Sequence, residues 1–192
     1  MPEKSTKGKI VNAAWALFYE QGYDNTTVDE IIKKSGTSKG SFYHYFEGKD
    51  ALLSTLSYVF DEKYSELESL IDENANTFDT LIFLNQELFG MVEDRISMDL
   101  LTRLYSTQLI TKGEKHLLDR NRLYYRLLRK IALKGQEKGE LKSDIPANEI
   151  VKLYALTERA LLYDWCICNG EYSLKNYSKT VMPMFLSGIK AK

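Results

Sequence analysis

The 192-residue sequence is poor in the residues that build covalent, redox or metal sites. It has two cysteines, Cys166 and Cys168, and two histidines, His44 and His116. Residues two apart on a helix point to nearly opposite sides, so the two thiols cannot readily form a disulfide or share a metal ion. The sequence also contains no recognisable Ser/His/Asp set, metal-ligand spacing or phosphate-binding loop. We therefore expect neither an enzyme nor a bound cofactor or metal.

Signals for secretion and membrane insertion are missing as well. The start of the chain, MPEKSTKGK, has no apolar run of the kind found in signal peptides. The most apolar stretch, residues 150–168, contains four charged side chains and is a poor membrane span. We expect a cytoplasmic protein with reduced thiols and no membrane contact.

Neither sign of charge is in excess, since Lys and Arg number 26, Asp and Glu number 27, and the formal net charge is −1. The overall charge therefore gives no indication of a nucleic-acid partner. Locally, the segment from Lys33 to Lys49 contains four lysines and a single acidic residue, Glu47. The first fifty residues as a whole are neutral, so any basic surface there is a patch.

Proline is rare, and apolar residues recur with helical spacing throughout the chain. A first helix is expected at about 5–21. A second begins with a capping box formed by Thr27 and Glu30 and ends at Ser35-Gly36. A third, at about 39–46, follows within three residues. Two short helices joined by so tight a glycine-bearing turn are typical of a helix-turn-helix.

The rest of the chain is expected to be helical too. A long helix at about 49–73 is followed by further segments at about 77–92, 97–111, 114–138, 147–169 and 174–189, and Pro183 should kink the last one or end it early. The sequence thus predicts an all-α protein of about nine helices. The chain divides near residue 48 into a three-helix head and a larger helical body.

The predicted third helix lies in the segment TSKGSFYHYF, residues 37–46, which holds more aromatic residues than one short helix can bury. Phe42 and Phe46 are four apart and share a buried face, so Tyr43 and His44 point outward. Gly40 costs roughly 1 kcal/mol in a helix interior. Its presence suggests that a partner, such as base edges in a DNA groove, approaches the backbone closely.

The starts of the neighbouring helices could hold phosphate groups. Lys49 adds positive charge at the amide-rich N-terminus of the next helix. Thr26 and Thr27 offer the same kind of site at the start of the second helix. Taken alone, the lysines of this region fit an ordinary solvated surface better than a DNA contact.

The order and spacing of these motifs resemble the DNA-binding head of the TetR/AcrR family of transcriptional regulators, over about residues 8–55. The resemblance implies that Lys39, Gly40, Ser41 and Tyr43 face base edges or the adjacent backbone, and that Thr27, Tyr43, Tyr45 and Lys49 hold phosphates. It favours Tyr45 as an outward group where helical geometry favours His44, and both stay candidates. The full candidate set comprises Thr26, Thr27, Ser38, Lys39, Gly40, Ser41, Tyr43, His44, Tyr45 and Lys49.

One position departs from the family pattern. Near the start of the second helix, where a basic or polar residue often assists base reading, this chain has Asp29. A carboxylate there would repel phosphate or accept a hydrogen bond from a cytosine amine.

The resemblance further implies that residues 1–48 form a helix-turn-helix DNA-binding domain and residues 49–192 a domain for effector binding and dimerisation. Segment 150–168 is apolar on almost every side, so we expect it to pair with the last helix across a homodimer interface. The interface candidates are Leu161, Tyr177, Val181 and Phe185.

Aromatic residues of the body could line an effector pocket, although most of them individually fit a packed core. The pocket candidates are Phe89, Tyr105, Tyr125, Tyr163 and Trp165. A basic run between Lys115 and Lys134 fits a solvated helix face, with contact to an anionic ligand as the alternative.

The sequence therefore predicts a regulator that binds double-stranded operator DNA, most simply a repressor released by a small apolar or aromatic effector. The alternative is an architectural or cell-division factor of the same fold that has no effector.

Overall fold

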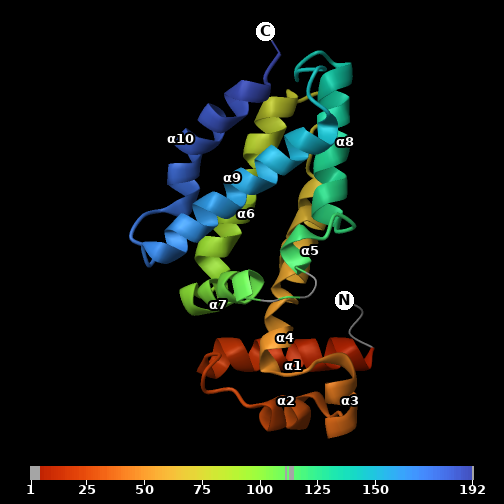
Figure 1. The fold of residues 1–192 in the computed structure, drawn as a ribbon, viewed down its shortest axis with the longest axis vertical. Coiled ribbons are helices and arrows are strands. Elements are labelled where there is room, and N and C mark those ends of the chain that lie inside the picture. Colours follow the sequence, from red (N-terminus) through yellow and green to blue (C-terminus); the bar gives the residue numbers. More distant parts are fainter. Residues whose placement is uncertain (1–4, 111, 113–114, 192) are drawn as a thin grey trace. The chain divides into compact units, whose positions relative to one another are not determined.

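The computed structural model describes residues 5–110, 112 and 115–191. Its elements are ten α-helices and two short 3₁₀ helices (Figure 1). No strand occurs among these residues, and the one β-type pairing is an isolated bridge between Leu141 and Lys190. The predicted all-α fold class is confirmed. None of the helices described is long and apolar enough to cross a membrane.

The chain forms two compact units, and each is described by itself. The first contains the described residues up to Val59 together with those of Asp99–Leu117. The second contains Phe60–Met98 and the described residues from Leu118 onward. The predicted functional boundary after residue 48 stays a prediction.

The first unit contains three helices at its N-terminal end whose bounds follow from the sequence. They are α1 (Thr6–Gln21), α2 (Val28–Ser35) and α3 (Lys39–Tyr45). Both reciprocal hydrogen bonds of the Thr27–Glu30 capping box are present, as predicted. Gly36 ends α2 in the left-handed conformation that favours glycine, with a φ of 62°. Helix α1 packs on α2 and α3 around the fully buried side chains of Ile10, Ile31 and Phe42.

The prediction of a single long helix at 49–73 is wrong. The structure has α4 (Lys49–Leu53) and α5 (Leu56–Glu68), separated at Ser54 and Thr55. Their hydroxyl groups donate to the carbonyl oxygens three residues back, at Ala51 and Leu52. Such local hydrogen bonds compete with the helical pattern.

A residue outside this segment also contributes a hydrogen bond at the break. The Trp15 indole N–H of α1 donates to the Thr55 hydroxyl at 2.8 Å. Helix α7 (Met98–Ile110) completes the first unit, together with the 3₁₀ helix η1 (His116–Leu118) up to Leu117.

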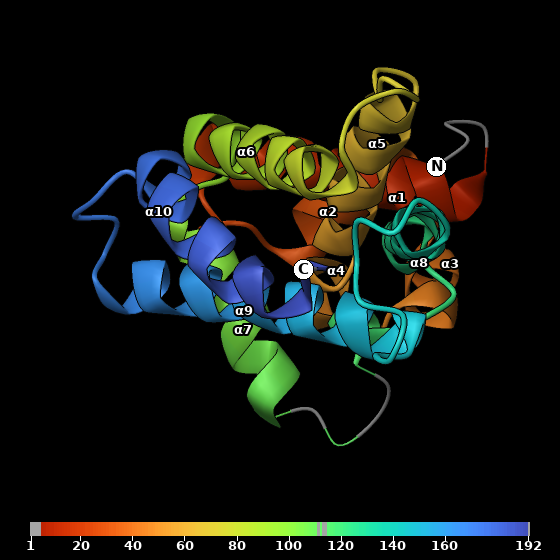
Figure 2. The ribbon, with the colours of Figure 1, turned by 90° about the horizontal axis from the view of Figure 1, so that it is seen from above.

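The second unit packs α6 (Thr77–Arg95), α8 (Leu123–Glu137), α9 (Ala147–Ile167) and α10 (Leu174–Leu186) around a common core. Helix α10 lies along α6 and α9, and α8 packs on α6 and α9 (Figures 1 and 2). The chain then ends in the 3₁₀ helix η2 (Ser187–Ile189).

Two helix boundaries in this part of the chain differ from expectation. The segment predicted at 114–138 becomes α-helical only at Leu123, because Arg122 has an extended backbone and pairs with Asp61 at 3.0 Å. Residue 114 of that prediction, and residue 111 at the end of the segment predicted at 97–111, lie outside the described residues. Pro183 does not end the last helix, which continues to Leu186.

Candidate DNA-binding surface and a basic cavity

Helix α3 presents its first turn to solvent. The Ser38 hydroxyl caps the helix by accepting from the Ser41 N–H at 3.0 Å, and the two hydroxyls are 2.9 Å apart. The Lys39 side chain is 70% exposed, and its ammonium lies 3.9 Å from the Asp29 carboxylate of α2. At this separation and exposure the pairing is weak, so Lys39 stays available to a partner.

The aromatic residues of α3 divide into an inner and an outer set. Phe42 is fully buried and Phe46 nearly so, as predicted. Tyr43, His44 and Tyr45 are all exposed, with Tyr43 at 49% and Tyr45 at 42%. The two alternatives left open by the sequence, His44 and Tyr45, therefore both face outward.

Gly40 has open space where a side chain would be. A Cβ atom at this position would meet nothing nearer than the Ser38 hydroxyl oxygen at 3.9 Å. The fold itself therefore does not require glycine at residue 40. This agrees with a requirement set by a partner that approaches the exposed helix surface.

Of the two threonines at the start of α2, one is exposed. Thr26 is 1% exposed and its hydroxyl donates to the Gly22 carbonyl at 2.8 Å. Thr27 is exposed, but its hydroxyl is engaged with the Glu30 carboxylate at 2.8 Å. The backbone hydrogen bond from Thr27 is the main cause that lowers the pKa of Glu30.

Lys49 is held inside the first unit. Its ammonium donates to the Tyr23 and Thr26 carbonyl oxygens, at 2.7 and 2.9 Å, and lies 4.2 Å from the centre of the Tyr23 ring. The Tyr23 hydroxyl donates in turn to the Asp50 carboxylate. Burial, followed by this hydrogen bond, raises the pKa of Tyr23. Lys49 thus ties the turn before α2 to the start of α4, and its predicted phosphate contact stays a prediction.

A side chain of α7 contacts the same turn. Arg103 pairs with Asp24 at 2.5 Å and with Asp99 at 2.9 Å, and its guanidinium lies 4.9 Å from the centre of the Tyr23 ring. The hydrogen bond with Asp99 is the main cause that raises the pKa of Arg103. Sequence reasoning missed this residue, because a lone arginine in a helix carries no signal of its partners.

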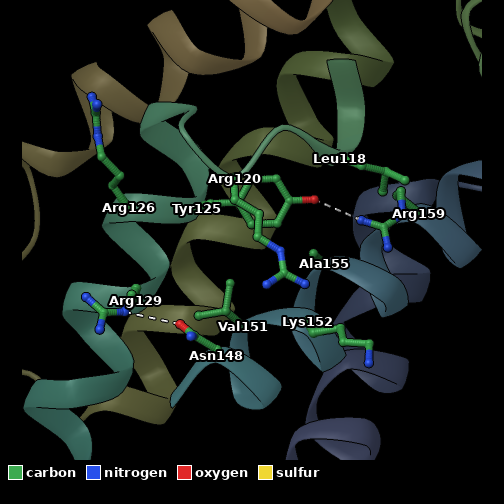
Figure 3. Close-up of a pocket in the computed structure, with 10 residues that line it drawn as sticks. All are labelled: Leu118, Arg120, Tyr125, Arg126, Arg129, Asn148, Val151, Lys152, Ala155 and Arg159. Atoms are coloured by element: carbon green, nitrogen blue, oxygen red, sulfur yellow. Dashed lines mark hydrogen bonds between the residues drawn. The ribbon is translucent and has the colours of Figure 1, made fainter. Parts of the chain in front are cut away.

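The five predicted pocket residues do not gather around one cavity. Tyr125 lines a cavity of about 310 Å³ between α8 and α9, shown in Figure 3. Phe89 is fully buried, Trp165 is buried and donates to the Tyr172 carbonyl, and Tyr163 is 47% exposed. Tyr105 belongs to the first unit.

A buried carboxyl group in the second unit also escaped prediction. Glu158 of α9 is 3% exposed and accepts hydrogen bonds from Tyr124 at 2.7 Å, Asn85 at 3.0 Å and Tyr64 at 3.3 Å. Burial raises the pKa of Glu158, and these hydrogen bonds oppose the rise. The side-chain amide oxygen of Asn85, Oδ1, has no hydrogen-bond partner among the described residues. Across the described residues no group of three His, Cys, Asp or Glu side chains could hold a metal ion.

The four predicted interface residues differ in how far they are exposed. Leu161 is 6% exposed and therefore packs inside its own subunit. Tyr177 and Phe185 of α10 are 49% and 50% exposed, and Val181 between them is half-buried. Further large apolar side chains are exposed on the same two helices, namely Leu156, Tyr163, Ile167 and Met184.

Comparison with known proteins links the first unit to one family. Residues 10–56 match the model of "Bacterial regulatory proteins, tetR family". The fatty acid metabolism regulator protein of Bacillus subtilis is 24% identical over 188 residues, which cover 96% of this chain and 95% of the relative. The transcriptional repressor KstR2 of Mycobacterium tuberculosis is 22% identical over 187 residues, covering 96% and 93%.

Solved structures share the fold over nearly the full length. FadR of Thermus thermophilus, a repressor solved with lauroyl-CoA, is 22% identical with a TM-score of 0.76, covering 98% of this chain and 96% of that one. FadR of Bacillus subtilis, solved with stearoyl-CoA, is 24% identical with a TM-score of 0.65, covering 94% and 98%. Residues 10–56 therefore match the helix-turn-helix of the tetR family of bacterial regulatory proteins, and the whole chain shares the fold of regulators that contain it.

Proposed function

We propose that this protein is a dimeric, cytoplasmic repressor that binds operator DNA through α3 and is released from it by a fatty acyl-CoA. The observation that carries DNA binding is the outer surface of α3. It combines the exposed Lys39, Tyr43 and Tyr45 with a glycine that the fold does not require. A short helix of this kind fits the major groove, where base edges can be distinguished.

Binding as a dimer follows from the geometry of DNA. Two recognition helices related by a two-fold axis read half-sites about 34–36 Å apart, or multiples of that spacing. The exposed apolar side chains of α9 and α10 supply the surface for the second subunit. Of the predicted interface residues, Tyr177 and Phe185 are the most exposed and are therefore available to this surface.

The effector class is proposed from the relatives. One is named as a regulator of fatty acid metabolism, and two similar structures hold lauroyl-CoA and stearoyl-CoA. A ligand can release the operator only by as much as it prefers the conformation that does not bind DNA. Helix α5 contains residues of both units, so a change in the second unit can be passed to the first through this helix.

The direct test is to select bound fragments from the genomic DNA of the source organism and to measure Lys39→Ala on the selected site. We expect the variant to lose preference at one base position by roughly 1–3 kcal/mol. Lys33→Ala is the matched control, because Lys33 is an exposed lysine of α2 that lies outside the predicted DNA-binding set. Unchanged affinity and preference in Lys39→Ala would rule out α3 as the recognition helix.

A further inference from the structure

The cavity between α8 and α9 gathers positive charge. Five cationic side chains line it: Arg120, Arg126, Arg129, Lys152 and Arg159. No Asp or Glu is found among the described residues that line it. Val151 and Ala155 of α9 form an apolar floor, and the Arg120 and Arg159 guanidinium groups lie near this floor, whereas Arg126 extends away from it (Figure 3).

Most of these charges have no acidic partner. The side chains of Arg120 and Arg126 make no hydrogen bond or ion pair with any described residue, and the hydrogen bond that Arg126 donates is that of its backbone N–H to the Arg122 carbonyl. Arg129 donates to the Asn148 side-chain carbonyl at 3.1 Å, and Arg159 to the Tyr125 hydroxyl at 3.3 Å. Lys152 alone lies near a carboxylate, that of Glu149 at 3.3 Å.

Positive charge without an acidic partner is not found along the whole of α8. Lys130, which is next to Arg129 in the sequence but does not line the cavity, pairs with Glu68 at 3.0 Å. The chain as a whole carries a formal charge of −1. Like charges brought together without counter-charges repel one another, and a bound anion removes that cost.

We infer that this cavity binds phosphoryl groups and that it holds the phosphate-bearing nucleotide end of the effector. The identity of the ligand rests on the proposed function, whereas phosphate binding follows from the cavity alone. Arginine forks match phosphate oxygens in pairs of hydrogen bonds. The apolar floor and the Tyr125 ring suit a flat base. A volume of about 310 Å³ lies at the lower end of the range of small-molecule sites, which suits one part of a ligand.

The first experiment probes the phosphate site without any acyl chain. Adenosine 3′,5′-bisphosphate is titrated calorimetrically into the full-length protein and into the double variant Arg120→Gln/Arg129→Gln. We expect saturable binding to the unmodified protein and a loss of about tenfold or more in the double variant, since charge-assisted hydrogen bonds to phosphate are removed.

Lys130→Gln is the matched control on the same helix and should bind the probe as the unmodified protein does. Both replaced arginines are exposed, so equal melting temperatures should show that the variants are folded. Equal affinity of the double variant and the unmodified protein, or no saturable binding by the unmodified protein, would overturn the inference.

The second experiment separates the cavity from the proposed effector. Palmitoyl-CoA and palmitoyl-pantetheine carry the same acyl chain, but only the first has the nucleotide and its phosphates. We expect the unmodified protein to bind palmitoyl-CoA more tightly, and the double variant to bind the two esters alike.

If the unmodified protein binds both esters equally well and both release the operator, the assignment of the nucleotide end is wrong and the proposed function stands. If neither ester releases the operator but the arginine-dependent binding of the bisphosphate persists, the proposed effector is wrong and the phosphate site stands.

Discussion

The side chains of α3 have two different roles at the scale of single residues. Phe42 and Phe46 are buried and hold the helix against the head, whereas Tyr43, His44 and Tyr45 are exposed. Burial of the first pair is needed for folding. Leaving three neighbouring ring side chains exposed does not bury apolar area in the fold. We therefore propose that these side chains contact a partner.

Gly40 gives the sharpest prediction at this scale. Replacing it with alanine should raise the free energy of unfolding by up to about 1 kcal/mol, because alanine is the better helix former and its Cβ meets no neighbour. The same variant should bind operator DNA more weakly, by roughly fivefold or more, since a methyl group enters the surface that faces the bases. Denaturant unfolding and a DNA titration measure the two effects. Unchanged DNA affinity would show that nothing approaches this position closely.

Several single residues show what the sequence could and could not predict. The Thr27–Glu30 capping box and the burial of Phe42 follow from spacing along one helix, and both were predicted correctly. The burial of Thr26 and the hydrogen bonds of Lys49 depend on carbonyl oxygens in the turn before α2. A pattern along the chain does not contain that information.

At the scale of elements, the break between α4 and α5 is a feature that the sequence pattern concealed. Residues 49–73 have a helical apolar pattern, and it takes the hydroxyl groups of Ser54 and Thr55 to interrupt it. Thr55 also accepts from Trp15, forty residues earlier in the chain. The apolar pattern predicted the helical character of both segments, but the break between them also involves a partner that is distant in the sequence.

Thr55→Ala should lower the free energy of unfolding by roughly 1–3 kcal/mol, because the Trp15 indole N–H is buried and would lose its acceptor. Urea unfolding of the full-length protein measures the change. Thr55→Ser retains the hydroxyl and should recover most of the loss. Equal destabilisation by serine would show that the methyl group, and not the hydrogen bond, matters at this position.

The buried Glu158 links α9 to α5, α6 and α8 and predicts a pH dependence. Its pKa is raised in the folded protein, so the folded state binds this proton more tightly than the unfolded chain does. The stabilising contribution is complete below the unfolded pKa of about 4.3 and is lost as the pH rises through the raised folded pKa.

Glu158→Gln removes this titration. The free energy of unfolding of the variant, minus that of the unmodified protein, should therefore increase as the pH is raised from about 4 to 8. Urea unfolding at a series of pH values measures this difference, and other titrating groups cancel in it. A difference that does not change with pH would mean that Glu158 has an ordinary pKa.

For the whole molecule, the exposed apolar side chains of α9 and α10 suggest which substitutions can test the proposed dimer. Phe185→Glu should yield folded monomers that lose operator affinity, because Phe185 is 50% exposed and a charge there disfavours an apolar interface. Leu161→Glu is the contrasting variant, because Leu161 is 6% exposed and a charge there should unfold the subunit.

Light scattering at micromolar concentration gives the mass, and circular dichroism gives the helix content. A dimer mass for Phe185→Glu would exclude this residue from the interface. A monomer mass for the unmodified protein would contradict the proposed dimer altogether.

In the proposed function, the operator and an acyl-CoA compete through two conformations of one protein. Coupling of this kind is reciprocal for binding free energies, and typical values of 1–3 kcal/mol correspond to changes of roughly 5–150-fold. The most direct measurement is the affinity of palmitoyl-CoA for the free protein and for the operator complex. We expect the operator to weaken palmitoyl-CoA binding by the same factor by which palmitoyl-CoA weakens operator binding. Equal affinities in the two titrations would contradict the proposed release by acyl-CoA and favour a DNA-binding factor without an effector.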